Sequence, residues 1–385
     1  MKKRYRVALL ILVNIFSAFL LTSCWNYREP DNLTLVRGLA IDPTEEGKFF
    51  LSVETADMHQ AGPEGKVKST VIETEGETMF DAVRNAVLVN VPRLYWSHAT
   101  VVFISQKLAE EGVLKITDFL IRDAETRLDV HPIIYKGEEA KEIFDVKPIS
   151  AELVSEEVMD LLHAQKSTSK TLHVQMFEFL ERLANEGISP VMPVITTKEN
   201  KGQKTLKLSG LALFKKDKLV GYLDEEDTKF YCFAIDEVDG GLLVVDVETE
   251  GKQGKITLEI LNSGTRFKAK YKENKVTIEM KISVRASMND VQIPGFPAEE
   301  KDFDIIMQMA SQQLKYDIEN VIKKVQVMNT DVFGFGSLVK RQLPKVWKEI
   351  GKDWDSIFKE LEVEVSADVE IAHTGLLKKS IKRGD

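Results

Sequence analysis

The sequence predicts a multidomain α+β protein, with a mixed α/β amino-terminal part and a carboxy-terminal antiparallel sheet packed by one long helix. In the first half, short β-branched segments alternate with helical patterns. In the second half, every second residue is apolar from Val276 to Val284 and again over 361–371, which is typical of strands with one wet face. Between them, apolar residues recur every three or four positions over 299–325, which predicts a helix about 40 Å long.

The predicted elements of residues 24–150 form an amino-terminal α+β domain. We expect strands over 35–41, 49–55, 99–104 and 130–135. We expect helices over 78–90, 106–111, 116–126 and 138–144.

The rest of the chain divides at a polar stretch. Residues 151–197 are predicted to form a helical middle segment or a small second domain, because apolar spacing indicates two helices that end at Gly187. The polar stretch 196–205 is interpreted as the main domain boundary. Residues 206–385 form the predicted carboxy-terminal domain, which opens with a hairpin whose strands cover 210–214 and 219–223.

The first 24 residues resemble a bacterial lipoprotein signal. Four cationic residues within the first six precede an uncharged apolar stretch over 7–21, which is shorter than the roughly 20 residues of a membrane-spanning helix. Leu21-Thr22-Ser23-Cys24 resembles a lipobox, so we predict signal peptide 1–23, cleavage after Ser23 and a diacylglyceryl group on Cys24. The alternative is an uncleaved signal anchor with an unmodified Cys24.

Composition excludes several classes of function. The formal charge of −9 argues against nucleic acid as a partner, because phosphate binding requires a basic face. Two cysteines cannot form a disulfide scaffold or a four-thiolate zinc site. Cys232 lies in an apolar run and is predicted to be a core residue.

No catalytic or metal-binding motif is present, so we assign no catalytic residue, no metal ligand and no cofactor other than the acyl groups on Cys24. Gly334-Phe335-Gly336 lacks the third glycine of a dinucleotide loop and is interpreted as a hydrophobic turn. Asp236 and Asp239 have the wrong spacing for an EF-hand and indicate a turn. The six histidines are scattered, and His98 is interpreted as a structural histidine rather than a catalytic one.

A lysine-rich stretch over 198–218 stands out in this acidic chain. We predict that Lys201, Lys204 and Lys207 contact anionic lipid or an acidic partner. The alternative is an ordinary solvated face.

Several stretches together resemble the Ger(x)C lipoproteins, the C subunit family of bacterial spore germinant receptors. The similar segments run from Cys24-Trp25-Asn26-Tyr27-Arg28-Glu29 to about Gly375. They include Arg37-Gly38-Leu39-Ala40-Ile41-Asp42, Pro190-Val191-Met192-Pro193, Gly210-Leu211-Ala212-Leu213-Phe214 and Asp331-Val332-Phe333-Gly334-Phe335-Gly336.

The resemblance implies a non-enzymatic subunit of a nutrient receptor. It would be lipid-anchored on the outer face of the spore inner membrane. Its partners would be the A-type and B-type integral-membrane subunits, which it would contact to support germination. A solute-binding lipoprotein of a membrane transporter is the main alternative, and a tethered hydrolase is a third class.

Overall fold

The computed structural model describes residues 4, 5, 7, 11 and 12, 33–57, 68–89, 93–123, 125–249, 252–293 and 300–373. Ser23, Cys24 and most of the predicted signal peptide lie outside the described residues, so their assignment stays a prediction. In the part of the chain that is described, no helix combines the length and the apolar composition that crossing a membrane requires.

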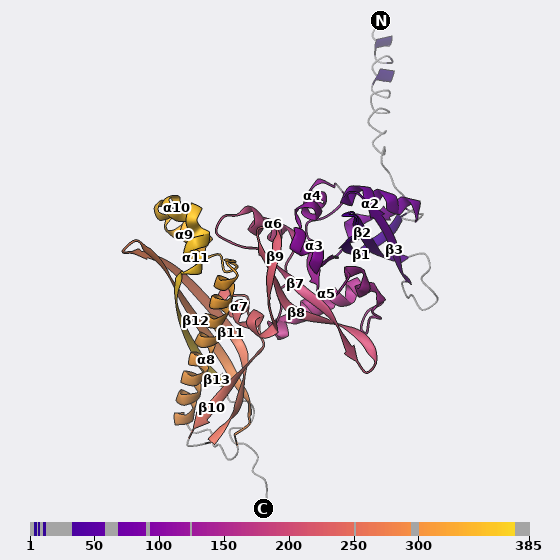
Figure 1. Ribbon diagram of the computed structural model, residues 1–385. Coiled ribbons are helices and arrows are strands. Elements are labelled where there is room, and N and C mark those ends of the chain that lie inside the picture. Colours follow the sequence, from indigo (N-terminus) through magenta and orange to yellow (C-terminus); the bar gives the residue numbers. More distant parts are fainter. Residues whose placement is uncertain are drawn as a thin grey trace, which may run out of the picture.

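The first lobe, residues 33–223, is built on a nine-stranded sheet (Figure 1). Its strand order is β3-β2-β1-β5-β6-β7-β8-β9, and β4 pairs with β1. The pairs β1–β4, β1–β5, β5–β6 and β6–β7 are parallel, and the pairs β1–β2, β2–β3, β7–β8 and β8–β9 are antiparallel. The strands are β1 (Leu33–Pro43), β2 (Phe49–Asp57), β3 (Lys68–Gly76), β4 (Arg93–Tyr95), β5 (Val101–Ser105), β6 (His131–Tyr135), β7 (Val191–Asn200), β8 (Gln203–Lys215) and β9 (Lys218–Leu223).

Helices cover both faces of this sheet, so β5 and β6 are buried throughout, as parallel strands usually are. On one face, Val158 of α5 (Val154–Ala164) and Ile143 of the 3₁₀ helix η4 (Ala140–Asp145) share a core cluster with Phe103. The second core cluster contains the other face of the sheet and continues into the second lobe. The remaining helices of this lobe are α2 (Met79–Asn85), η2 (Ala86–Leu88), η3 (Trp96–His98), α3 (Gln106–Glu111), α4 (Leu114–Arg122), η5 (Gln165–Ser167) and α6 (Met176–Ala184).

The second lobe, residues 242–373, is a four-stranded sheet with α8 (Glu300–Val327) along one face (Figure 1). The predicted long helix is confirmed, and its inward stripe is almost completely buried: Ile306, Ala310, Leu314, Ile318, Val321 and Val325. The strands are β10 (Leu242–Thr249), β11 (Lys252–Lys272), β12 (Lys275–Val291) and β13 (Glu362–His373). The other helices are α7 (Glu225–Ile235), which connects the lobes, and α9 (Phe335–Gln342), α10 (Pro344–Ile350), η6 (Gly351–Asp353) and α11 (Trp354–Lys359).

The multidomain α+β class is confirmed, but one strand direction differs from the prediction. β10–β11 and β11–β12 are antiparallel, whereas β13 pairs in parallel with β12. Alternating apolar residues show which face of a strand is buried but not which way the strand runs. The four helices α8 to α11 form the crossover connection that a parallel pair requires.

Two further segments differ locally from the prediction. The middle segment 151–197 is not helical throughout, because β7 begins at Val191 and pairs with β6 and β8. The predicted helix over 138–144 is the 3₁₀ helix η4, where the Asp42 carboxylate accepts hydrogen bonds from the backbone N–H groups of Ala140 and Lys141. The polar stretch 196–205 forms the end of the β7–β8 hairpin, within one sheet. The division into domains stays a prediction.

Candidate functional site

The two lobes meet at a junction, which we define by Arg182, Gly187, Tyr231, Asp331 and Gly336. Arg182 and Gly187 belong to α6 and to the loop that follows it in the first lobe. Asp331 and Gly336 belong to the loop after α8 and to the start of α9. A capping box at Gln175 and Glu178 sets the start of α6, and this fixes where Arg182 lies on the helix.

Asp331 organises the second-lobe side of the junction. Its carboxylate accepts hydrogen bonds from Phe335 N (3.0 Å), Gly336 N (2.8 Å) and Trp354 Nε1 (2.9 Å). Its backbone oxygen accepts a bond from Ser189 N of the first lobe at 2.8 Å. Burial raises the pKa of this carboxyl to about 6, although the hydrogen bonds it accepts act in the opposite direction.

Two glycines bring the backbones of the lobes into direct contact. A Cβ atom on Gly187 would lie 2.6 Å from the Gly336 carbonyl carbon, and one on Gly336 would lie 2.6 Å from Gly187 Cα. Gly187 also has a φ of +74°, which side chains other than glycine rarely adopt. The contact is closed by a hydrogen bond of 2.9 Å from Ser337 N to Gly187 O. Neither position accommodates a larger residue in this arrangement.

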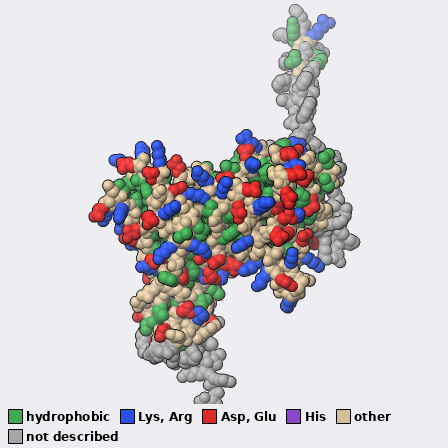
Figure 2. Space-filling view, in the orientation of Figure 1, with side chains coloured by type: hydrophobic (Ala, Val, Ile, Leu, Met, Phe, Trp, Pro, Cys, Tyr) green, Lys and Arg blue, Asp and Glu red, His purple; other side chains and the backbone are tan. Residues whose placement is uncertain are grey.

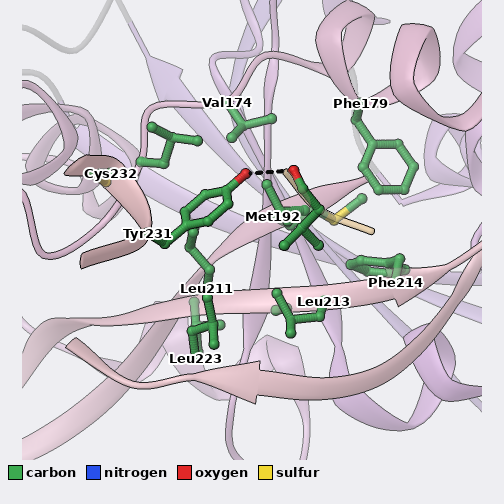
Figure 3. Close-up of a cluster of buried hydrophobic side chains, with 14 of the residues drawn as sticks. Val174, Phe179, Met192, Leu211, Leu213, Phe214, Leu223, Tyr231 and Cys232 are labelled. Atoms are coloured by element: carbon green, nitrogen blue, oxygen red, sulfur yellow. Dashed lines mark hydrogen bonds between the residues drawn. The ribbon is translucent and has the colours of Figure 1, made fainter. Parts of the chain in front are cut away.

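Tyr231 and Arg182 extend the junction into the core. The fully buried Tyr231 hydroxyl donates to Val332 O at 3.1 Å, and Arg182 Nη1 donates to that hydroxyl at 3.2 Å. Figure 3 shows the Tyr231 ring reaching from α7 toward Val174 and Met192 of the first lobe. Tyr231 therefore ties an apolar core shared by both lobes to the loop that carries Asp331.

A polar pocket of about 420 Å³ opens beside the junction. The charged and polar side chains that line it are His173, Glu178, Glu181, Arg182, Asn185, Glu237 and Ser337. Burial raises the pKa of Glu237, and nearby carboxylates act in the same direction. The volume lies within the usual range for small-molecule pockets.

The fold brings together three histidines that are far apart in the sequence. The His131 and His173 rings lie 4.3 Å apart between centroids, and His163 stacks on His173 at 5.7 Å. Burial lowers the pKa of His131 to about 4. Among the described residues, no group of three or more His, Cys, Asp or Glu side chains is arranged to hold a metal ion. His98 lies apart from this cluster, exposed, with its ring against Tyr95.

The predicted lysine contacts lie far from the junction, on the β7–β8 hairpin. Lys201 and Lys204 are exposed near its turn, whereas Lys207 is half-buried and forms an ion pair of 2.5 Å with Glu225. On the face shown in Figure 2, cationic and anionic side chains are mixed over both lobes. Whether these lysines contact lipid or a partner stays a prediction.

Cys232 is a buried core residue, as predicted. It is completely inaccessible, and burial raises the pKa of its thiol to about 12. The Gly334–Gly336 segment was predicted to be a hydrophobic turn, but it begins a helix instead: Gly334 is the N-cap of α9, and Phe335, which is buried, and Gly336 are its first two residues. The junction residues Arg182, Tyr231 and Asp331 were not predicted as a site. One indication was present in the sequence, and only for Asp331: residues 331–336 are among the segments that resemble the Ger(x)C lipoproteins.

The family comparison matches both halves of the chain in order. Residues 26–197 match the family described as "Spore germination protein N-terminal domain", and residues 209–375 match "Spore germination B3/ GerAC like, C-terminal". The chain belongs to the Ger(x)C family of spore germination proteins. The predicted family resemblance is thus confirmed, and the junction joins residues from both matched parts of the chain.

Other Ger(x)C proteins are similar over nearly the whole length. Spore germination protein KC of Bacillus subtilis (strain 168) is 25% identical over 404 residues, which cover 98% of each chain. Spore germination protein B3 of the same organism is 23% identical over 95% of this chain and 98% of its own. The crystal structure of the GerBC protein has a TM-score of 0.57 at 20% identity and covers 89% of this chain and 100% of that one. This likeness supports the shared fold.

Proposed function

We propose that this protein is a non-catalytic, lipid-anchored subunit of a nutrient germinant receptor. It acts through contacts with the A-type and B-type integral-membrane subunits, on the outer face of the spore inner membrane. The observation that carries the proposal is the family match across both halves of the chain. The lipobox at Cys24 supports the anchor, and the chain offers no catalytic motif.

The junction supports a role in transmission between partners. It joins the lobes by backbone contact at Gly187 and Gly336 and by a buried hydrogen-bond network at Tyr231 and Asp331. Close-packed contacts of this kind resist small displacements, so a movement imposed on one lobe is passed to the other. A conformational change in a partner bound to one lobe would thereby reach a partner bound to the other lobe.

Changing Cys24 to Ala tests the anchor. We expect the variant to be lost from spore membranes and nutrient-triggered germination to fall, because two acyl chains are what makes attachment stable. Retention in the membrane together with normal germination would contradict the anchoring part of the proposal. A pull-down of the lipidated protein from spore membranes tests the partners, and recovery without integral-membrane subunits would contradict a receptor role.

Changing Arg182 to Lys tests transmission, because lysine keeps the charge but cannot reproduce the guanidinium bonds to Tyr231 and Val332. We expect slower germination with an unchanged amount of receptor complex. The matched control is Arg127→Lys, at an exposed ion pair with Asp129. Equal germination rates for the two variants would contradict transmission through the junction.

The pocket beside the junction favours a second candidate, a solute-binding lipoprotein. Calorimetry of the full chain against amino acids and sugars tests it. Tight binding that is lost on changing Glu237 to Gln would support this class.

A further inference from the structure

The first lobe exposes a group of large apolar side chains on neighbouring helical segments. We define the apolar face by six residues: Phe80, Val87, Leu88, Val89, Leu114 and Ile121. Leu88 is 85% exposed and Val89 is 66% exposed, so these two protrude almost freely. Single exposed apolar residues are ordinary, but a contiguous group of them marks a binding surface.

The six residues form one surface because α2 and α4 pack together. The Phe80 ring meets the buried Phe119 ring edge-on, with centroids 6.0 Å apart. Leu114 and Ile121 are seven positions apart on α4, so they lie on one side of that helix, two turns from each other. Phe80, at the start of α2, and Val87, in η2, have the same spacing.

The start of β1 lies beside this apolar face. Leu33 pairs with Arg93 of β4, and β4 also contacts η2, which carries Val87 and Leu88. Cys24 precedes Leu33 by nine positions. A chain of that length spans at most about 30 Å, at roughly 3.3–3.6 Å per residue. A lipid attached to Cys24 therefore holds this edge of the first lobe near the bilayer.

We propose that the apolar face rests in the headgroup region of the membrane that holds the protein. The inference depends on the lipid anchor proposed above and adds an orientation to it. Apolar side chains at such a surface enter the boundary between headgroups and acyl chains, to a depth of about 5–10 Å. Leu88 and Val89 are the most exposed residues of this face, and Arg84, whose guanidinium lies 5.1 Å from the Phe80 ring centroid, is placed to meet lipid phosphates.

This orientation directs the other end of the first lobe away from the bilayer. In Figure 1 the β7–β8 hairpin ends on the side of the lobe opposite α2 and α4. Lys201 and Lys204 would then face a protein rather than anionic lipid. The membrane is favoured over a protein as the occupant of the apolar face, because the short tether to Cys24 places lipid there.

The chain suits a site-specific fluorescence test, because Cys232 is completely buried and Cys24 would be acylated. The full lipidated chain carrying Leu88→Cys is labelled with NBD and placed on phosphatidylethanolamine–phosphatidylglycerol vesicles that contain spin-labelled lipid. The matched control carries the same label at Lys201→Cys. We expect the probe at position 88 to lose most of its fluorescence and to shift to shorter wavelengths, and the probe at position 201 to change little.

Vesicle flotation in the same samples separates the anchor from the orientation. Flotation with little quenching at position 88 would overturn the orientation and leave the anchor intact, as expected if the apolar face binds a protein or another part of the chain. Quenching at position 201 instead of 88 would also overturn it. A chain that fails to float would overturn both the anchor and the inference that depends on it.

Discussion

Changing Asp331 to Asn tests whether burial or hydrogen bonding controls the carboxyl at the junction. Burial raises its pKa from 3.8 to about 6, despite three accepted hydrogen bonds. A carboxyl whose pKa rises on folding binds protons more tightly in the folded state. Its contribution to stability is therefore fully present below about pH 4 and declines as the pH rises through about 6.

The size of the effect follows from the difference between the two pKa values. A difference of about 2 pH units, at 1.36 kcal/mol per unit, corresponds to about 3 kcal/mol. Asparagine cannot ionise, so its contribution to the free energy of unfolding does not change with pH. The free energy of unfolding of the native protein, minus that of the variant, should thus fall by about 3 kcal/mol between pH 4 and pH 7.

Urea unfolding followed by tryptophan fluorescence measures this difference, because Trp347 and Trp354 pack together and Trp354 bonds to Asp331. The control Asp353→Asn changes an exposed carboxyl next to Trp354 in the sequence. A difference that stays constant from pH 4 to 7 would refute the reasoning. A difference that grows with pH would show that hydrogen bonding outweighs burial at this site.

Three further predictions concern packing and reactivity. Gly336→Ala should destabilise the protein by about 1–3 kcal/mol in urea, since its Cβ would press on Gly187, whereas Gly264→Ala has room and should change stability by less than about 0.5 kcal/mol. Leu314→Ala should cost about 2–5 kcal/mol, because this side chain on the inward face of α8 is fully buried, and a smaller loss would argue against that packing. Cys232 should resist maleimide until urea unfolds the protein, because burial raises its thiol pKa to about 12, and rapid native labelling would contradict this.

The features that sequence reasoning predicted depend on local periodicity. The stripe of α8 and the alternation over 276–284 repeat regularly along a single element, so counting positions was enough. α7 was missed because every residue from Thr228 to Ala234 is buried, and a helix buried on all sides shows no amphipathic period.

The strand β11 was missed for a different reason. Ile256, Leu258 and Ile260 are buried at even positions, whereas Ala269, beyond a register shift between Ile260 and Asn262, is buried at an odd one. The bulge moves the buried residues from even to odd positions. A count of apolar residues over the whole segment therefore favours neither set of positions, and no alternation is detected.

The junction could not be predicted from the sequence, because its residues come together only in the folded structure. Gly187 and Gly336 carry no side chain and are distant in sequence, so their contact leaves no periodic signal. In the sequence, Asp331 has the pattern of an ordinary loop residue. Only the structure shows that it is buried beside Trp354. The proposed lipid site at Cys24 depends on a short local motif, which is why sequence alone could nominate it.

The β7–β8 hairpin has a consequence for engineering. One family match ends in β7 at residue 197 and the other begins in β8 at residue 209, yet both strands lie in one sheet that continues to Leu223. A chimera of two relatives joined between residues 200 and 203 would place β7 of one beside β8 of the other, and so would replace one partner in every pair from Val191↔Leu213 to Asn200↔Gln203. A crossover after Leu223 keeps the sheet from a single parent. The unit that sequence comparison recognises is therefore not the unit that can be exchanged.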